Sequence, residues 1–292
     1  MKKKILIATS PFERAHFLPF LDEWLAASPH ECRFHDSEDA AGFLTTLETF
    51  SPDILVGAWD MPALPLSAVK SQGGSVEYFC FIPGSAKKQI TAAHLKAGLV
   101  FTNWGTWIGP YVAECALLLT LGALRRVGLW GQQLKANGIW RERLTNNHSL
   151  FRKRVGLHGF GSIAQSLVEL MRPFDPIVTA DTGVPDAILE RHGVKRAEST
   201  EALFAESDVL IELKPLNARN LQVGLDVFAV EPLPVDSPLR SMPNVFMLPH
   251  MGGATIDRGI YCGQRALQNV ENHIAGLPLD NQVTVKEFER AT

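Results

Sequence analysis

Several site patterns are absent from this chain of 292 residues. The four cysteines, Cys32, Cys80, Cys115 and Cys262, lie far apart without a CxxC pair, and we interpret them as reduced thiols of a cytoplasmic protein. No HExxH or comparable spacing occurs, so no metal site is indicated. The net charge is −3, both signs are interspersed, and no cationic run exceeds Lys2–Lys4, which argues against a nucleic-acid or membrane surface.

The chain also lacks internal repeats, low-complexity tracts and any long apolar run at its start. The first apolar run, Ile5–Ala8, is far too short for the core of a signal peptide or for a membrane span. The composition is 46% apolar, which is enough for two modest domains, each with its own core.

The first hundred residues alternate short apolar runs with helical patterns, which is typical of a parallel α/β sheet. We expect strands over Lys4–Thr9, His30–His35, Asp53–Ala58, Glu77–Ile82 and Leu99–Thr102. We expect helices over Phe17–Ala27, Ala41–Phe50 and Thr91–Ala97. This order predicts a small flavodoxin-like unit.

The longest helical pattern follows, over Tyr111–Leu134, without an internal proline. It is apolar on several faces, which indicates burial between layers or at a subunit interface.

A second unit begins near Arg154 and repeats the strand–helix alternation. Its strands are expected over Val155–Phe160, Ile177–Asp181, Asp208–Leu213, Gly224–Phe228 and Asn244–Leu248. Its helices are expected over Ser162–Met171, Ala187–His192 and Thr200–Glu206, with a closing helix over Gly259–Ala275. The sequence thus predicts an α/β protein of two doubly wound parallel-sheet domains, a substrate domain (1–102 with 259–292) and a Rossmann dinucleotide-binding domain (103–258).

The cofactor motif is the segment from Gly159 to Ala164, directly after an apolar strand and before an amphipathic helix. Gly159 permits a tight turn, Gly161 lets backbone N–H groups approach a pyrophosphate, and Ala164 lets the helix pack closely on the strand. With Phe160, Ser162 and Ile163 between them, these residues are candidates for cofactor binding. Such a motif alone occurs often by chance.

An acidic residue completes the motif. Asp181 ends the next strand, 20 residues beyond Gly161. A carboxylate there accepts hydrogen bonds from both ribose hydroxyls and repels a 2′-phosphate, which favours NAD over NADP. The alternative is a structural Asp that opens a turn before Gly183.

The stretch from Gly224 to Gly253 resembles the D-isomer specific 2-hydroxyacid dehydrogenases over about thirty consecutive residues. The segments that carry the resemblance are Gly224–Pro234, Asp236–Leu239, Pro243–Val245 and Leu248–Gly253. Weaker similarity spans nearly the whole chain.

The resemblance implies roles for particular residues. His250 would be the general acid in ketoacid reduction and the base in the reverse direction, because imidazole gains and loses a proton near neutral pH. Glu231 would pair with His250 and hold its tautomer. Asp226 would face the nicotinamide end of the cofactor, and Gly252 and Gly253 would let backbone approach it. The cofactor-binding set that the resemblance implies also includes Lys214 and Pro215.

In the first domain, the resemblance places the substrate loop at Gly84, Ser85 and Ala86, where backbone N–H groups can hold a carboxylate. The chain departs from the family pattern farther on, where Ile108 replaces a small polar residue beside Trp104 and Trp107. These bulky side chains would either shape the substrate pocket or pack the hinge between the domains.

One family segment is missing. The family has a further strand–helix unit, with an Asn-Thr-x-Arg-Gly motif whose arginine binds the substrate carboxylate, where this chain runs directly from Asn220 to Leu221. Roughly forty to fifty residues are absent, and losing a central parallel strand would leave backbone groups unpaired on both neighbours. Either the natural protein has the segment and this sequence omits it, or the deletion is genuine and the enzyme is impaired.

Together these features predict an NAD-dependent oxidoreductase that transfers a hydride between NAD(H) and a small 2-hydroxy or 2-keto acid. The alternative is a catalytically impaired NAD(H)-binding protein that acts as a redox sensor or a dimeric scaffold. A homodimer is expected from the resemblance, with the long helix as its contact. The sequence identifies neither the hydroxy acid nor the direction of the reaction.

Overall fold

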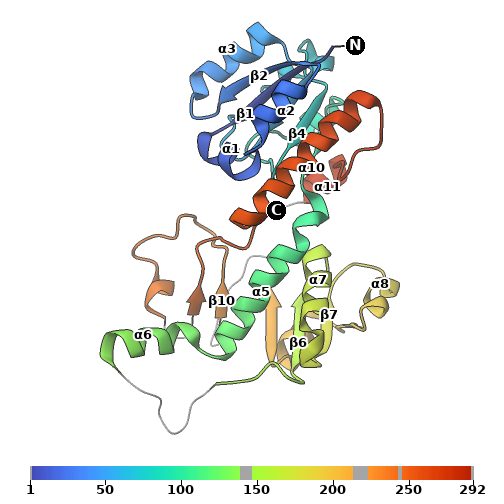
Figure 1. Cartoon of the computed structure of the whole chain (residues 1–292). Helices are drawn as coiled ribbons and strands as arrows, with labels where there is room; N and C mark the ends of the chain where they lie inside the picture. The colour runs from blue at the N-terminus through green and yellow to red at the C-terminus, as the bar shows by residue number, and fades with distance from the viewer. Residues whose placement is uncertain (1, 139–146, 213–222, 243–244, 291–292) are drawn as a thin grey trace. The chain divides into compact units, whose positions relative to one another are not determined.

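The computed structural model describes residues 2–138, 147–212, 223–242 and 245–290, and the chain forms two compact units (Figure 1). The first comprises residues 1–107 and 256–292, and the second residues 108–255. The first unit thus extends to residue 107 and resumes at residue 256, whereas the sequence predicted that it ends at residue 102 and resumes at residue 259. The segment after Thr102 stays with the first unit because Asn103 Nδ2 donates to Gly84 O (2.6 Å) and Asn281 Nδ2 donates to Trp104 O (3.2 Å).

The first unit contains a five-stranded, fully parallel sheet of the order β2-β1-β3-β4-β5. Its strands are β1 (Lys4–Thr9), β2 (Glu31–Asp36), β3 (Ile54–Gly57), β4 (Tyr78–Phe81) and β5 (Val100–Thr102). This order confirms the predicted flavodoxin-like arrangement.

Six helices belong to this unit among its described residues. They are α1 (Pro11–Phe17), α2 (Leu21–Ala27), α3 (Ala40–Phe50), α4 (Ala92–Lys96), α10 (Ile256–Ala275) and α11 (Val285–Arg290). The single helix predicted over Phe17–Ala27 is wrong. A capping box of Ser10 and Glu13 starts α1 earlier, and Pro19 separates α1 from α2 because proline cannot continue a helix.

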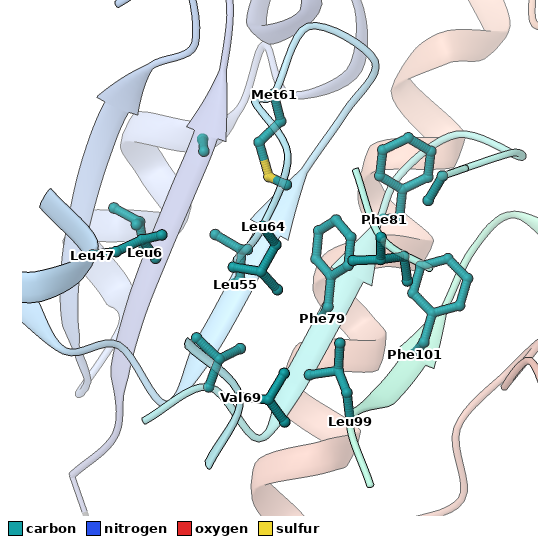
Figure 2. Close-up of a cluster of buried hydrophobic side chains, with 14 of the residues drawn as sticks. Leu6, Leu47, Leu55, Met61, Leu64, Val69, Phe79, Phe81, Leu99 and Phe101 are labelled. Atoms are coloured by element: carbon teal, nitrogen blue, oxygen red, sulfur yellow. The ribbon is translucent and has the colours of Figure 1, made fainter. Parts of the chain in front are cut away.

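The core of the first unit lies against its sheet (Figure 2). Every residue of β3 and β4 is buried, as expected for central parallel strands covered on both faces. Leu6, Leu55, Phe79 and Phe101 come from four neighbouring strands and pack in one cluster. The apolar runs that predicted these strands are therefore also the runs that build the core.

The buried cysteines belong to this interior. Cys80 on β4 and Cys262 on α10 are free thiols, as are Cys32 and Cys115. Burial raises the pKa of Cys80 to about 11 and that of Cys262 to about 12, so both stay protonated at neutral pH. They pack in the interior as small, largely apolar side chains.

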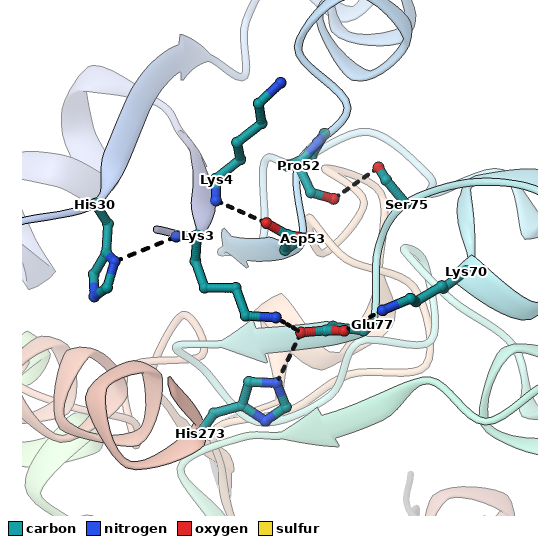
Figure 3. Close-up of polar contacts among 9 residues, drawn as sticks. All are labelled: Lys3, Lys4, His30, Pro52, Asp53, Lys70, Ser75, Glu77 and His273. Atoms are coloured by element: carbon teal, nitrogen blue, oxygen red, sulfur yellow. Dashed lines mark hydrogen bonds and ion pairs between the residues drawn. The ribbon is translucent and has the colours of Figure 1, made fainter. Parts of the chain in front are cut away.

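Ion pairs and hydrogen bonds connect charged side chains at the amino ends of these strands (Figure 3). Glu77, directly before β4, pairs with Lys3, with Lys70 at 2.8 Å, and with His273 Nε2 at 3.6 Å. Burial raises the pKa of Glu77, but the hydrogen bonds and charges of Lys3 and Lys70 outweigh it, and the pKa falls to about 2. The ionised carboxylate therefore stabilises the folded state.

We expect Glu77→Gln to lower the melting temperature by several degrees at pH 7, because it removes about 2–3 kcal/mol of this stabilisation. A carboxyl with a depressed pKa stabilises above its unfolded value near 4.5 and loses that effect as the pH falls toward 2. The difference in melting temperature between the wild type and Glu77→Gln should therefore shrink in thermal melts as the pH falls from about 4.5 to about 2. Glu289→Gln, which breaks an exposed pair with Lys96, is the control and should have little effect. An equal deficit at pH 2 and pH 7 would contradict this assignment.

The second unit contains two parallel sheets, of the order β8-β7-β6-β9 and β10-β11. Their strands are β6 (Arg154–His158), β7 (Ile177–Asp181), β8 (Lys195–Arg196), β9 (Val209–Glu212), β10 (Val223–Leu225) and β11 (Val245–Met247). The helices of this unit are α5 (Gly109–Leu124), α6 (Val127–Asn137), α7 (Ser162–Met171), α8 (Asp186–Arg191) and α9 (Thr200–Glu206). Short 3₁₀ turns in the chain are Leu66–Ala68, Lys70–Gln72, Gly105–Ile108, Arg172–Phe174 and Pro238–Ser241.

The long helix predicted over Tyr111–Leu134 is interrupted. Arg126 adopts a left-handed conformation (φ 54°) between α5 and α6, so two helices replace one. Residues Gly105–Leu124 are long and apolar enough to cross a membrane, by length and composition. Of this apolar window 28% is buried, and α5 packs closely on α7, where an added Cβ on Gly109 would lie 3.3 Å from the Ser162 backbone.

The sheet of the second unit is discontinuous in the part of the chain that the structure describes. There, β9 pairs only with β6, and β10 pairs only with β11. The helix α5 contacts β9, β10 and β11, and Leu119 lies directly over Gly224. The discontinuity falls beside residues 213–222, which lie outside the description and within which the family resemblance predicts a missing strand–helix unit.

Candidate active site

The cofactor motif forms a tight turn at the carboxyl end of β6. Gly159 has φ 99°, which favours glycine, and its N–H donates to Asp181 O at 2.9 Å. An added Cβ on Gly159 or Gly161 would meet nothing within 4 Å. The backbone is therefore open to a ligand, which fits a pyrophosphate.

The helix α7 starts immediately after Gly161, and no side chain caps it. Its first-turn N–H groups lack intrahelical partners and attract anions. Ala164 is fully buried and Phe160 nearly so, whereas Ser162 and Ile163 are half-buried. Phe160 can therefore reach a cofactor only through its backbone, while the N–H groups of Ser162 and Ile163 belong to the open helix end.

Asp181 lies among polar groups that the sequence did not single out. Thr200 Oγ1 donates to Asp181 Oδ2, and His158 Nε2 lies 3.7 Å from the same oxygen. His158 Nδ1 is 2.7 Å from Glu212 Oε2. His158, Asp181 and Glu212 end β6, β7 and β9, so parallel pairing brings them to one edge. Only the position of His158, just before Gly159, could have indicated this cluster.

The two predicted catalytic residues lie together. His250 Nδ1 is 2.6 Å from Glu231 Oε2, and Phe228 N donates to Glu231 Oε1 at 2.8 Å. The carboxylate is thus held by backbone while it orients the imidazole. The His250 side chain is 57% exposed, so its other ring nitrogen can reach a substrate.

Asp226 holds the loop that carries His250. Its two carboxylate oxygens accept from Met251 N (2.6 Å) and Gly252 N (2.8 Å). An added Cβ on Gly252 would lie 2.6 Å from Asp226 Oδ2, so this close approach requires glycine. Gly253 continues the same loop and is half-buried. Lys214 and Pro215, the remaining predicted cofactor residues, lie outside the described residues.

The predicted substrate loop belongs to the first unit, at the carboxyl end of β4. Asn103 Nδ2 donates to Gly84 O, and Trp104 N donates to Pro83 O at 3.1 Å, so the loop is held through its carbonyl groups. Within the described parts of the chain, the backbone N–H groups of Gly84, Ser85 and Ala86 donate to no protein acceptor. Such amides are suited to an anionic ligand.

A family model described as D-isomer specific 2-hydroxyacid dehydrogenase, NAD binding domain, matches residues 117–223 and 213–252. The chain belongs to this family. The match includes the turn at Gly159, Asp181, Glu231 and His250, and NAD is accordingly the cofactor of the second unit. The two matched stretches overlap at residues 213–223.

Similar proteins agree with this assignment. Glyoxylate/hydroxypyruvate reductase B of Yersinia enterocolitica is 25% identical over 240 residues, which cover 66% of this chain and 73% of that protein. A glyoxylate reductase structure from Paecilomyes thermophila has a TM-score of 0.79 at 19% identity, covering 97% of this chain and 99% of that one. The structure of D-2-hydroxyisocaproate dehydrogenase has a TM-score of 0.74 at 18% identity, and the match covers 96% of this chain and 99% of that one. The two structures show the shared fold.

We expect Asp181→Ala to weaken NADH binding about tenfold or more, because charge-assisted hydrogen bonds to the ribose would be lost. The preference for NADH over NADPH should narrow as well, because the carboxylate no longer repels a 2′-phosphate. Fluorescence titration with both cofactors measures this. Asp186→Ala, which removes an exposed carboxylate paired with Arg196, is the control. An unchanged NADH/NADPH ratio would rule out this role for Asp181.

Proposed function

We propose that this protein reduces a small 2-keto acid, or oxidises the matching 2-hydroxy acid, with NAD(H) as the hydride carrier. The observation that carries the proposal is the Glu231–His250 pair, with 2.6 Å between carboxylate oxygen and imidazole nitrogen. It lies in the same unit as the open turn at Gly159 and Gly161. An oriented imidazole beside a nicotinamide cofactor is the arrangement that ketone reduction needs.

The proton transfer follows from the geometry of His250. Glu231 accepts a hydrogen bond from Nδ1–H of His250, so Nε2 is the ring nitrogen that exchanges a proton with the substrate oxygen. When bound, NAD supplies or accepts the hydride. In reduction, His250 gives its Nε2 proton to the carbonyl oxygen, and in oxidation it removes the hydroxyl proton. Asp226 holds the backbone beyond His250 in place through Met251 and Gly252.

We also propose that the loop Gly84–Ala86 of the first unit binds a carboxylate group. Its three amide N–H groups have no acceptor in the described protein. Neutral amides can bind a carboxylate, but they polarise a neighbouring carbonyl less than a bidentate guanidinium does. The absence of the family's arginine from this sequence therefore predicts slow turnover and weak substrate binding, not loss of cofactor binding.

His250→Ala should lower kcat about 10²- to 10⁴-fold and leave the Kd for NADH nearly unchanged, because the imidazole moves a proton and does not hold the cofactor. The assay follows NADH absorbance with glyoxylate, hydroxypyruvate and pyruvate. The control is His192→Ala, which breaks another His–Glu pair of this unit, with 2.9 Å between His192 Nδ1 and Glu169 Oε1. Equal losses in both variants would contradict the proposal.

A second candidate is an NAD(H)-binding redox sensor or scaffold without turnover. The specific observation in its favour is the discontinuous sheet beside the missing arginine segment. Tight NADH binding together with no turnover across a broad 2-keto acid panel would favour it over the enzyme.

We also propose a cytoplasmic homodimer that forms through α5. Its Leu118 is 54% exposed, and Val127 and Leu134 on α6 are each 51% exposed. Apolar side chains exposed along neighbouring helices are typical of a subunit contact. The free cysteines agree with a reducing compartment.

Leu118→Glu should convert the dimer to a monomer, because a charge would be buried at the contact. Light scattering after size exclusion should then show 32.1 kDa in place of about twice that mass. Leu170→Glu, at a 40% exposed position on α7, is the matched control and should leave the dimer intact. A monomeric wild-type protein, or a dimer that tolerates Leu118→Glu, would exclude this interface.

A further inference from the structure

One more donor lies beside the loop Gly84–Ala86. An added Cβ on Gly84 would be 2.4 Å from Trp104 Nε1 and 2.9 Å from Trp104 Cε2. The nitrogen edge of the indole therefore rests directly on the Gly84 backbone, an approach that only glycine permits. The indole N–H donates to no acceptor in the described protein, yet it is not sealed from solvent.

The indole is held in this position by its surroundings. The backbone of Trp104 donates to Pro83 O (3.1 Å) and accepts from Asn281 Nδ2 (3.2 Å). Trp59 meets its ring edge-on, with 5.8 Å between centroids. Trp59, Gly84 and Trp104 follow β3, β4 and β5, so parallel pairing brings them to the carboxyl edge of one sheet. Ligands of open α/β sheets bind at that edge.

The space beside Trp104 also has a cation. Arg265 on α10 lies over the ring of Trp107 (5.1 Å to the centroid) and pairs with Asp280 at 3.2 Å. The two tryptophans and this arginine line one small pocket of the first unit, together with Asn103, Asp280 and Asn281. The guanidinium and the Asp280 carboxylate therefore both lie in the wall, which is polar but not net cationic.

We propose that the Trp104 indole N–H is a further donor to the substrate carboxylate, next to the amides of Gly84, Ser85 and Ala86. The inference rests on the proposed function, since it assigns a residue to the same substrate. The indole is neutral, so it adds to carboxylate binding without polarising the reacting carbonyl. Its loss should therefore change KM and not kcat.

Trp104→Phe keeps an aromatic ring against Gly84 and removes only the N–H. We expect KM for glyoxylate and pyruvate to rise about tenfold or more, because a hydrogen bond to a charged group is lost. The kcat should stay within about twofold, and the Kd for NADH should not change. Trp24→Phe, the same substitution on α2 of the same unit, is the matched control and should leave all three constants unchanged.

A second measurement does not depend on turnover. The protein has six tryptophans, so its ¹H–¹⁵N spectrum contains six indole N–H signals, and Trp104→Phe identifies one of them. Oxamate, the monoamide of oxalic acid and an isostere of pyruvate that is not reduced, is added to the NADH complex. We expect the Trp104 signal to move downfield and saturate, and the Trp24 signal to stay in place.

The outcomes separate this inference from the proposed function. If the wild type turns over 2-keto acids while Trp104→Phe leaves KM unchanged and oxamate does not move the Trp104 signal, the inference fails and the function stands. If no 2-keto acid is turned over but oxamate shifts the Trp104 signal, the enzymatic function fails and the carboxylate site stands. If oxamate shifts no indole signal and no turnover occurs, both are wrong.

Discussion

Parallel strand pairing brings together the polar groups at the cofactor turn and the aromatic groups at the Gly84 loop. In a parallel sheet all carboxyl ends meet at one edge, so residues far apart in the chain become neighbours when they end adjacent strands. Pairing of β6 with β7 and β9 brings Asp181 and Glu212 to His158 at the cofactor turn. Pairing of β3, β4 and β5 brings Trp59 and Trp104 to the loop at Gly84. The same geometric rule therefore applies in both units.

The same dependence makes the discontinuity between β9 and β10 important. A parallel strand interior to a sheet is paired on both sides, and a missing one leaves N–H and C=O groups of its neighbours without a ladder. The helix α5 contacts β9, β10 and β11, so it joins the two sheets by packing. The candidate catalytic pair Glu231–His250 lies in loops that follow the smaller sheet, so its position relative to the cofactor turn depends on that packing.

Local sequence patterns predicted the strands well, because a strand buried on both faces is a continuous apolar run. The runs ending at Thr9, Gly57 and Phe81 are such strands. The patterns did not predict the two places where the backbone ends one helix and begins another. Pro19 separates α1 from α2, and Arg126 in a left-handed conformation separates α5 from α6. The proline was visible in the sequence, whereas an arginine with positive φ has no sequence signal.

The sequence alone determined the cofactor turn and the candidate catalytic pair. The turn needs residues of fixed size at fixed spacing, and the pair lies in a family motif of about thirty residues. Only the tertiary structure decided what surrounds them. Thr200 beside Asp181, Glu212 beside His158, and the Trp104 indole against Gly84 are contacts between separate strand ends. No local pattern encodes such contacts, because they form only after the strands pair.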